Sequence, residues 1–250
     1  TRWQASLAFG KDHETIHRSG RVCEDRPEGI GYAVGYLRSP DSGKTWERSD
    51  GMEVDLPTTP STIDAVEAAP SPDSPLNMWV GCIAVDPSGV PWLIYSRLDR
   101  QPFESWLAHP DGKGGWTKQS ILPAAQDQWP DRGVQTPGEV VFDRDGVMYV
   151  AVTTVLTDRD AEGLCWGAGS DEIGLLVSRD GGQSFQVYQV SHPDTDTPNW
   201  LPNMERPTTA DPIGVPCLIY THGHRGETNK DILSNDVFWC DVGELIRVGR

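Results

Sequence analysis

Two segments of this chain follow one eight-residue template, S-x-D-x-G-x-[T/S]-[W/F]. The two copies span 39–46 and 178–185, and a more divergent copy spans 109–116. Each copy lies between strand-like runs, which is typical of a hairpin turn whose Asp accepts backbone N–H bonds and whose Gly permits positive φ. The Asp residues of the three copies, Asp41, Asp111 and Asp180, are separated by 70 and 69 positions. A turn that recurs at so regular a spacing predicts a repeat architecture.

A second motif, a D-x-x-G turn followed by an apolar strand, recurs independently of the first. The copies at 85–95 and 210–220 agree at most positions, and 141–151 is a looser third copy. Taken together, the two motifs give each unit four strands, which is the pattern of a β-propeller blade. No long stretch carries helical periodicity, so we predict an all-β chain.

The repeat divides the chain into four predicted antiparallel blades of one propeller domain. Their bounds are 1–56, 57–123, 124–192 and 193–250. We expect strands at 3–9, 13–17, 31–38, 45–48; 79–85, 91–97, 103–109, 115–121; 138–143, 147–155, 172–178, 184–190; and 203–209, 216–222, 233–240, 243–248. Because an unclosed ring leaves two bare sheet edges, we expect these blades to be a fragment of a six- or seven-bladed ring. A complete four-bladed ring is the alternative.

The chain is strongly acidic, with a formal net charge of −16. This charge opposes the phosphate neutralisation on which nucleic-acid binding rests, and it opposes attraction to an anionic membrane surface. We therefore expect neither partner. An acidic substrate would need a local Arg or Lys pocket to overcome the global field. We expect a monomer that uses no cofactor.

Five cysteines are odd in number and widely spaced: Cys23, Cys82, Cys165, Cys217 and Cys240. Cys82 and Cys217 fall in predicted buried strands, where a free thiol behaves as a small apolar residue. No C-x-x-C pair suggests zinc. A disulfide involving Cys23 or Cys165 is left open, and the sequence shows no signal peptide or membrane span.

The S-x-D-x-G-x-T-W turns resemble the Asp-box, or bacterial neuraminidase repeat, of sialidase-like β-propellers. The resemblance covers all four units at the level of the repeat pattern. It implies that the box joins the third and fourth strands of a blade, on the side away from the active site, so Asp41, Trp46 and Asp180 are expected to be structural. Such propellers include sialidases, other glycosidases, polysaccharide lyases and non-catalytic binding proteins. The resemblance thus implies a carbohydrate partner and a secreted or periplasmic protein, without deciding the reaction.

Sialidases usually carry a F/Y-R-I-P sequence near their start, and this chain has none. The nearest approach to it is the tripeptide at 205–207, Glu-Arg-Pro. The chain looks closer to the fourth class of these repeat proteins, which includes propeller lyases of acidic polysaccharides. Those lyases use His, Tyr and Arg, so the resemblance slightly favours a lyase over a hydrolase.

The best cluster of chemically active side chains lies at 220–225, in the fourth unit. Strand alternation would put Tyr220, His222 and His224 on one face if the strand continues that far. Elimination on a uronate needs a cation for the carboxylate, a base for the proton α to it, and an acid for the leaving oxygen. The expected catalytic groups are Arg206 or Arg225 as the cation, His222 or His224 as the base, and Tyr220 as the acid.

These candidates have simpler alternatives. Tyr220 could be a core residue, as its repeat partner Tyr95 would be. The H-x-H spacing permits a metal, but no third ligand is aimed at it, so we predict no metal site. His17 and Arg18 echo the His-Arg pair at 224–225 and are expected to face the same channel from the first blade, with an ordinary loop pair as the alternative.

Hydrolysis would instead need two carboxylates, and Glu172 and Glu205 are the candidates. Three tryptophans in polar loops are expected to stack on sugar rings: Trp129, Trp166 and Trp200. The alternative for each tryptophan is a wedge between blades. We therefore predict a glycan-cleaving enzyme, with a sialidase-type hydrolase and a non-catalytic glycan- or protein-binding propeller as the alternatives.

Overall fold

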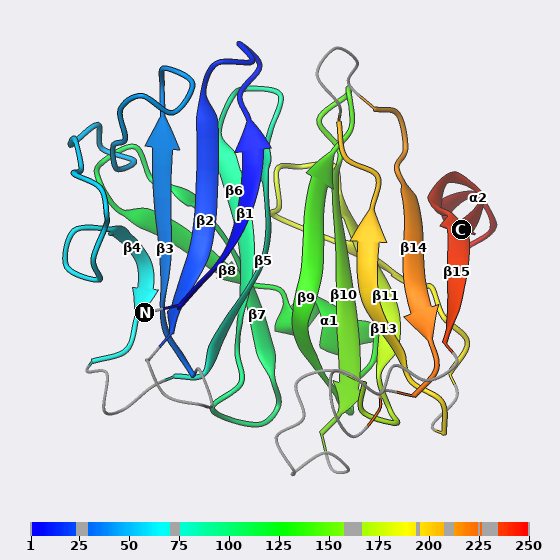
Figure 1. Ribbon diagram of the computed structural model, residues 1–250. Coiled ribbons are helices and arrows are strands. Elements are labelled where there is room, and N and C mark those ends of the chain that lie inside the picture. Colours follow the sequence, from blue (N-terminus) through cyan, green and yellow to red (C-terminus); the bar gives the residue numbers. More distant parts are fainter. Residues whose placement is uncertain are drawn as a thin grey trace.

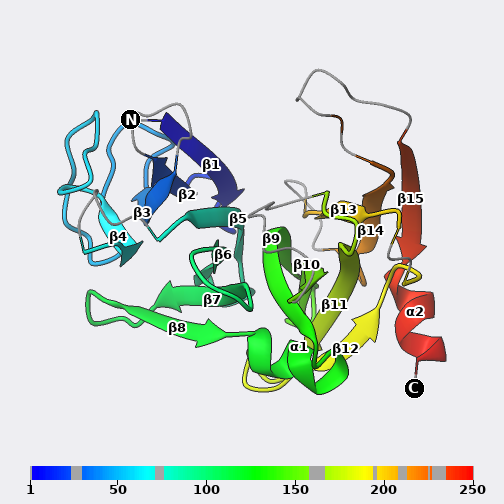
Figure 2. The ribbon, with the colours of Figure 1, turned by 90° about the horizontal axis from the view of Figure 1, so that it is seen from below.

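Four antiparallel sheets follow one another around a common axis in the computed structural model (Figures 1 and 2). The structure describes residues 2–23, 30–70, 76–157, 167–193, 196–207, 213–224, 226 and 235–249. In the view of Figure 2 the first strand of each sheet lies toward the middle and the last strand lies outside. The prediction of an all-β, propeller-like chain is confirmed.

The strands are hydrogen-bonded in chain order within each sheet. The first sheet contains β1 (Arg2–Phe9), β2 (Ile16–Cys23), β3 (Gly31–Ser39) and β4 (Asp64–Ala68). The second contains β5 (Met78–Val85), β6 (Pro91–Arg97), β7 (Glu104–Pro110) and β8 (Trp116–Ser120). The third contains β9 (Arg132–Phe142), β10 (Met148–Leu156), β11 (Glu172–Ser178) and β12 (Gln186–Gln189). The fourth contains three strands within the described residues, β13 (Asn199–Met204), β14 (Cys217–His222) and β15 (Asp236–Asp241).

Two strands of the first unit differ from the prediction. The second strand begins at Ile16 because Asp12 accepts bonds from the backbone of Glu14 and Thr15 and holds a turn there. The fourth strand of the first sheet is β4, whereas 45–48 supplies only isolated bridges, from Glu47 to Arg38 and to Glu53. The first unit therefore extends beyond residue 56.

Two short helices, α1 (Leu122–Gln128) and α2 (Val242–Val248), stand among the strands. Helix α2 replaces the strand predicted at 243–248. The side chain of Asp241 accepts the N–H of Glu244 at 3.0 Å, and Glu244 pairs with Arg247 one turn later. An N-cap of this kind and an i,i+3 ion pair favour a helix over a strand.

The two ends of the sheets differ in the turns they carry. The first and third strands of a sheet run in the same direction, so the D-x-x-G turns and the turns that resemble Asp-boxes lie at one end, here called the Asp-turn end. The connections between second and third strands lie at the other end, here called the loop end. In the turn at 178–185, Asp180 Oδ1 accepts the N–H of Ser184 at 2.9 Å, and in the turn at 39–46, Asp41 Oδ1 accepts that of Thr45 at 2.8 Å.

Apolar side chains fill the spaces between successive sheets. Between the first and second sheets lie Val34, Tyr36, Val66, Ile83, Leu93 and Tyr95. Between the second and third lie Trp92, Ile94, Leu107, Val140, Phe142 and Val150. Between the third and fourth lie Tyr149, Leu175, Val177, Met204, Leu218 and Ile246.

The innermost strands approach one another closely. A Cβ atom on Gly81 of β5 would lie only 2.3 Å from the carbonyl oxygen of Gly138 on β9. The neighbouring thiol of Cys82 contacts the backbone of Val140, at 2.9 Å from its nitrogen and 3.3 Å from its oxygen. Glycine at 81 is therefore required by space.

Gly81→Ala should lower the free energy of unfolding by about 1–3 kcal/mol, because the added methyl would overlap backbone atoms of another sheet. Gly214→Ala is the matched control, since its Cβ would meet nothing nearer than a flexible guanidinium nitrogen of Arg144 at 3.8 Å. Urea denaturation of both variants measures the difference. Equal effects would contradict the close approach of β5 and β9.

Hydrogen bonds from Ser184 and Ser178 lower the pKa of Asp180 from 3.8 to about 2. A depressed folded-state pKa contributes stability above pH 4 and loses it as the pH falls toward 2. Asp180→Asn should therefore be less stable than the native chain at pH 7, and the difference should shrink between pH 4 and pH 2. Thermal unfolding across this range measures it, with Asp127→Asn, at an exposed helical position outside the turns, as the control for loss of a surface carboxylate.

Candidate functional site

Buried polar side chains gather at the loop end of the third and fourth sheets. Eight of them are Gln135, Thr153, Thr154, Ser170, Asp171, Glu172, Ser191 and Asn199. The two sheets are joined there, because the backbone N–H of Asn199 donates to the carbonyl oxygen of Asp171 at 2.8 Å. Burying polar groups costs free energy unless they are hydrogen-bonded to one another. The hydrogen bonds of this cluster therefore stabilise it.

A chain of hydrogen bonds runs from a carboxylate through an amide to an imidazole. Asn199 Nδ2 donates to Glu172 Oε2 at 2.9 Å, and His222 Nδ1 lies 3.0 Å from Asn199 Oδ1. Ser191 Oγ also donates to Glu172 Oε2. Glu172 and Asn199 are almost fully buried, whereas His222 is half-buried. Of the three hydrogen-bonded groups, the imidazole of His222 is therefore the one that a ligand could reach.

The segment that carries His222 is tied down on both sides. The strand register pairs Asn199 with His222 directly. Gly223 N donates to the carbonyl oxygen of Pro198 at 3.1 Å, and Trp200 Nε1 donates to the carbonyl oxygen of Gly223 at 3.0 Å. Gly223 has a φ of 141°, a conformation that favours glycine. The end of β14 is thus fixed relative to β13.

Tyr220 and His222 share one face of β14, as the sequence predicts. Both contact the ring of Phe238 on β15: Tyr220 stacks on it at 5.6 Å between ring centroids, and His222 meets it edge-on at 5.3 Å. Burial raises the pKa of Tyr220, so its hydroxyl is protonated at neutral pH. His224 is exposed and lies beyond the end of the strand, so alternation does not extend to it.

Other polar residues of the cluster were missed by the sequence analysis. Arg132, at the start of β9, donates to the carbonyl oxygen of Ser170 at 2.7 Å. Gln135 Nε2 donates to Asp171 Oδ1 at 3.1 Å, and Asp171 Oδ2 accepts the N–H of Gly167 at 2.7 Å. Asn199 is not among the residues that the sequence analysis proposes for the site. Nothing in its local pattern signals the partners that it meets across two sheets.

The strand register separates Arg206 and Glu205 from His222. They follow the last residue of β13, at the Asp-turn end, whereas His222 pairs with the first residue of β13 at the loop end. Arg206 forms an ion pair with the buried Glu139 of β9, and Glu205 accepts the N–H of Cys217 at 3.3 Å. The expectation that Arg206 approaches the histidines is therefore wrong.

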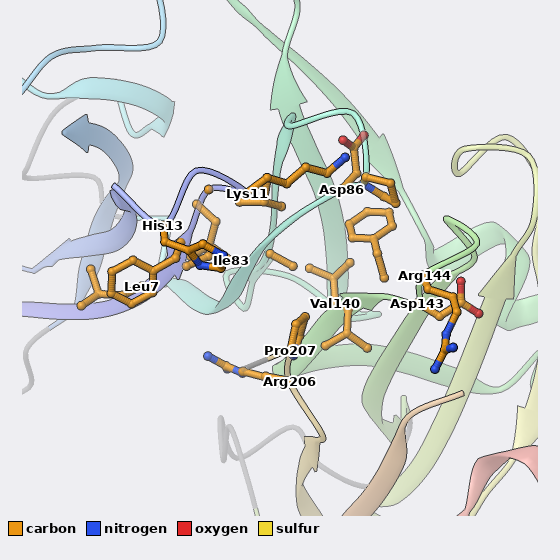
Figure 3. A pocket seen from close by; sticks show the side chains of 18 residues that line it. Leu7, Lys11, His13, Ile83, Asp86, Val140, Asp143, Arg144, Arg206 and Pro207 are labelled. Carbon is orange, nitrogen blue, oxygen red and sulfur yellow. The ribbon is translucent and has the colours of Figure 1, made fainter. Parts of the chain in front are cut away.

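Arg206 instead lines a hollow of about 460 Å³ at the Asp-turn end of the axis (Figure 3). Its walls are mainly apolar, with Leu7, Phe9, Ile83, Val140 and Phe142 among them. The charged residues that line it are Lys11, Asp86, Asp143, Arg144 and Arg206. Its carboxylates hold the D-x-x-G turns, since Asp86 accepts the N–H of Val90 and Asp143 that of Val147, each at 2.9 Å. The hollow therefore offers mixed charges with structural roles, and its lining does not include His222.

The remaining candidates are structural or fall outside the described residues. Trp129 and Trp200 are buried, and Trp129 covers Gly174, whose Cβ would lie 2.4 Å from the indole. Neither ring has a free face for a sugar, so their proposed stacking role is not supported. Trp166 and Arg225 lie outside the described residues.

His17 and Arg18 lie on β2 and do not extend from a loop into a channel. His17 is buried with Nδ1 2.8 Å from Tyr36 Oη. Arg18 is half-buried and lies on the opposite face of the strand. The structure does not bring this pair to His222.

Within the described residues, no three His, Cys, Asp or Glu side chains come together in an arrangement that could hold a metal ion. No helix there combines the length and apolar character needed to cross a bilayer.

Comparisons with known proteins give a fold but no family. No protein-family model matches the chain, and no curated protein matches it. Among solved structures, a protein of unknown function from Dyadobacter fermentans is similar with a TM-score of 0.57 and 15% identity, over 96% of this chain and 60% of that one. A PL25 ulvan lyase is similar with a TM-score of 0.57 and 15% identity, over 95% of this chain and 50% of that one.

A third similar structure is the Hadza microbial sialidase Hz136, with a TM-score of 0.51 and 16% identity, over 94% of this chain and 43% of that one. At these identities the likeness establishes only the fold of the chain, which is that of a β-propeller. The chain spans between two-fifths and three-fifths of the length of these three proteins.

Burial, followed by the charge of Arg38, lowers the pKa of His17 from 6.5 to about 4. Between these values the unfolded chain binds a proton that the folded chain does not, so stability should fall as the pH drops from 6.5 to 4. His17→Leu should remove up to about 3 kcal/mol of this pH dependence. Denaturant titrations at pH 7 and pH 4 measure it, and an unchanged dependence in the variant would contradict a buried, neutral His17.

Proposed function

We propose that the chain belongs to a glycan-cleaving enzyme that acts by elimination on a uronate-containing polysaccharide, with the reacting centre at His222. The observation that carries the proposal is the placement of His222 and Tyr220 on one face of β14, at the loop end, away from the Asp-boxes. There His222 is held by Asn199 and reachable from solvent. The likeness to the ulvan lyase supports this choice of substrate class, since a second structure of such a lyase, similar with a TM-score of 0.55, is bound to -[GlcA(1-4)Rha3S]-.

The roles follow from the protonation of each group. His222 takes the proton α to the uronate carboxylate as the base, because its ring nitrogen is the reachable basic atom of the cluster. Tyr220, which stays protonated at neutral pH, gives its proton to the leaving oxygen. Arg225, which lies outside the described residues, is the proposed cation for the carboxylate, since Arg206 is committed to Glu139 at the other end.

Hydrolysis by the predicted carboxylate pair is less well supported. Glu172 lies beside the start of β13 and Glu205 follows its end, six residues later. An extended strand advances about 3.3 Å per residue, so the two groups are separated by roughly 20 Å. The carboxylates of glycosidases stand at most about 10 Å apart. Glu172 and Glu205 therefore cannot flank one glycosidic bond.

Incubation with uronate polymers, including a sulfated glucuronyl-rhamnose polymer, should produce the ultraviolet absorbance of an unsaturated uronate. His222→Ala should lower turnover by about 10²–10⁴-fold, because the base is lost. The exposed His192→Ala is the matched control and should retain activity, with circular dichroism confirming that both variants fold.

The alternatives give different results in the same assay. Reducing sugar released without the ultraviolet product would indicate hydrolysis, and binding without either would indicate a non-catalytic propeller. Full activity in His222→Ala would refute the proposed centre, and loss of activity in His224→Ala alone would move the base to His224.

A further inference from the structure

We infer that Glu172 and Asn199 are positioning residues that hold His222 in the tautomer protonated on Nδ1, so that Nε2 is the atom that receives the substrate proton. The inference rests on the proposed function of His222 and adds to it the atom that reacts and the residues that select it.

The selection follows from which groups can donate. An ionised carboxylate only accepts hydrogen bonds, so the amide of Asn199 must turn its NH₂ group toward Glu172. The distance from Nδ2 to Glu172 Oε2 is 2.9 Å. This orientation leaves Asn199 Oδ1 facing His222 Nδ1 at 3.0 Å. Since an amide oxygen only accepts, Nδ1 must carry the hydrogen, and in the neutral ring Nε2 then holds the lone pair.

Burial prevents the opposite arrangement. Glu172 is 1% exposed and Asn199 is 3% exposed, so water cannot readily replace a lost bond. A flipped amide would set its oxygen against the carboxylate and its NH₂ group against the imidazole. Ser191 Oγ holds the same carboxylate oxygen from another direction, and it also accepts the N–H of Ile173 at 2.8 Å. The position of the Glu172 carboxylate therefore does not depend on Asn199 alone.

The hydrogen bonds from Glu172 through Asn199 to His222 also stabilise the positive charge that develops on His222 during elimination. The Cα–H bond of the uronate breaks, its proton goes to Nε2, and its electron pair forms the C=C bond as the glycosidic C–O bond breaks. The leaving oxygen receives its proton from Tyr220 Oη. The ring becomes an imidazolium with its Nδ1–H still directed at Asn199, and the negative Glu172 lies one amide away. Glu172 exchanges no proton with substrate, because it is buried behind Asn199.

Nitrogen-15 NMR of the imidazole rings tests the tautomer without substrate. We expect His222 to show a protonated Nδ1 and an unprotonated Nε2 at a pH where the ring is neutral. His109 is an internal reference, because its Nδ1 lies 3.0 Å from the carbonyl oxygen of Pro110 and must carry a hydrogen for the same reason. Its signals also report whether each variant is folded.

Asn199→Leu and Glu172→Gln should shift His222 to a mixture of both tautomers while His109 stays unchanged. Ser191→Ala is the matched control, since it removes a donor to Glu172 but leaves the bond from Asn199 in place. In Asn199→Leu, kcat should fall by about tenfold or more with little change in KM. If His222 kept the Nδ1–H tautomer in both Asn199→Leu and Glu172→Gln, the inference that these two residues select the tautomer would be wrong.

The two proposals fail in different ways. A native His222 protonated on Nε2 overturns this inference even if the chain cleaves uronate polymers through His222. A native Nδ1–H tautomer in a chain that cleaves no glycan overturns the proposed function, and with it the proton transfer to Nε2, while the selection by Asn199 and Glu172 stands.

Discussion

The close approach of the innermost strands around the axis is the constraint on which the rest of the structure depends. β5 and β9 belong to different sheets and share no backbone ladder, so their inner edges need other partners. Gly81 lets the backbones meet, and the buried Cys82 bonds both polar groups of Val140. Burial raises the pKa of this thiol to about 12, which keeps its hydrogen available for donation. A larger residue at either position would spread the sheets apart.

Packing of the sheets about this axis makes the two ends chemically different. Toward the Asp-turn end, the interfaces are filled by apolar side chains such as Phe142 and Met204. At the loop end of the third and fourth sheets, the same interface carries Asp171, Glu172 and Asn199. Burying a carboxylate costs free energy unless it is hydrogen-bonded, and buried titratable groups are common at functional sites. This asymmetry, more than the size of any hollow, favours the loop end for ligand chemistry.

Local chemistry made part of this structure predictable. The turns at Asp41 and Asp180 could be read from the sequence because all their hydrogen bonds lie within a few residues. Tyr220 and His222 share a face because strand alternation is also local. Helix α2 was missed, although the Asp241 cap and Glu244 were readable, because the repeat pattern favoured a last strand. Arg206 was misplaced, and Asn199 overlooked, because the register of β13 on β14 depends on contacts between distant segments.

The environment of Glu172 also bears on the choice between reactions. A hydrolase would need this carboxylate to exchange protons with substrate or to attack it, and so to be reachable and free on at least one side. Glu172 is buried and accepts bonds from Ser191 and Asn199. The amide of Asn199 connects this carboxylate to the imidazole of His222. A carboxylate placed in this way can orient a base but cannot replace one, which supports His222 as the proposed base.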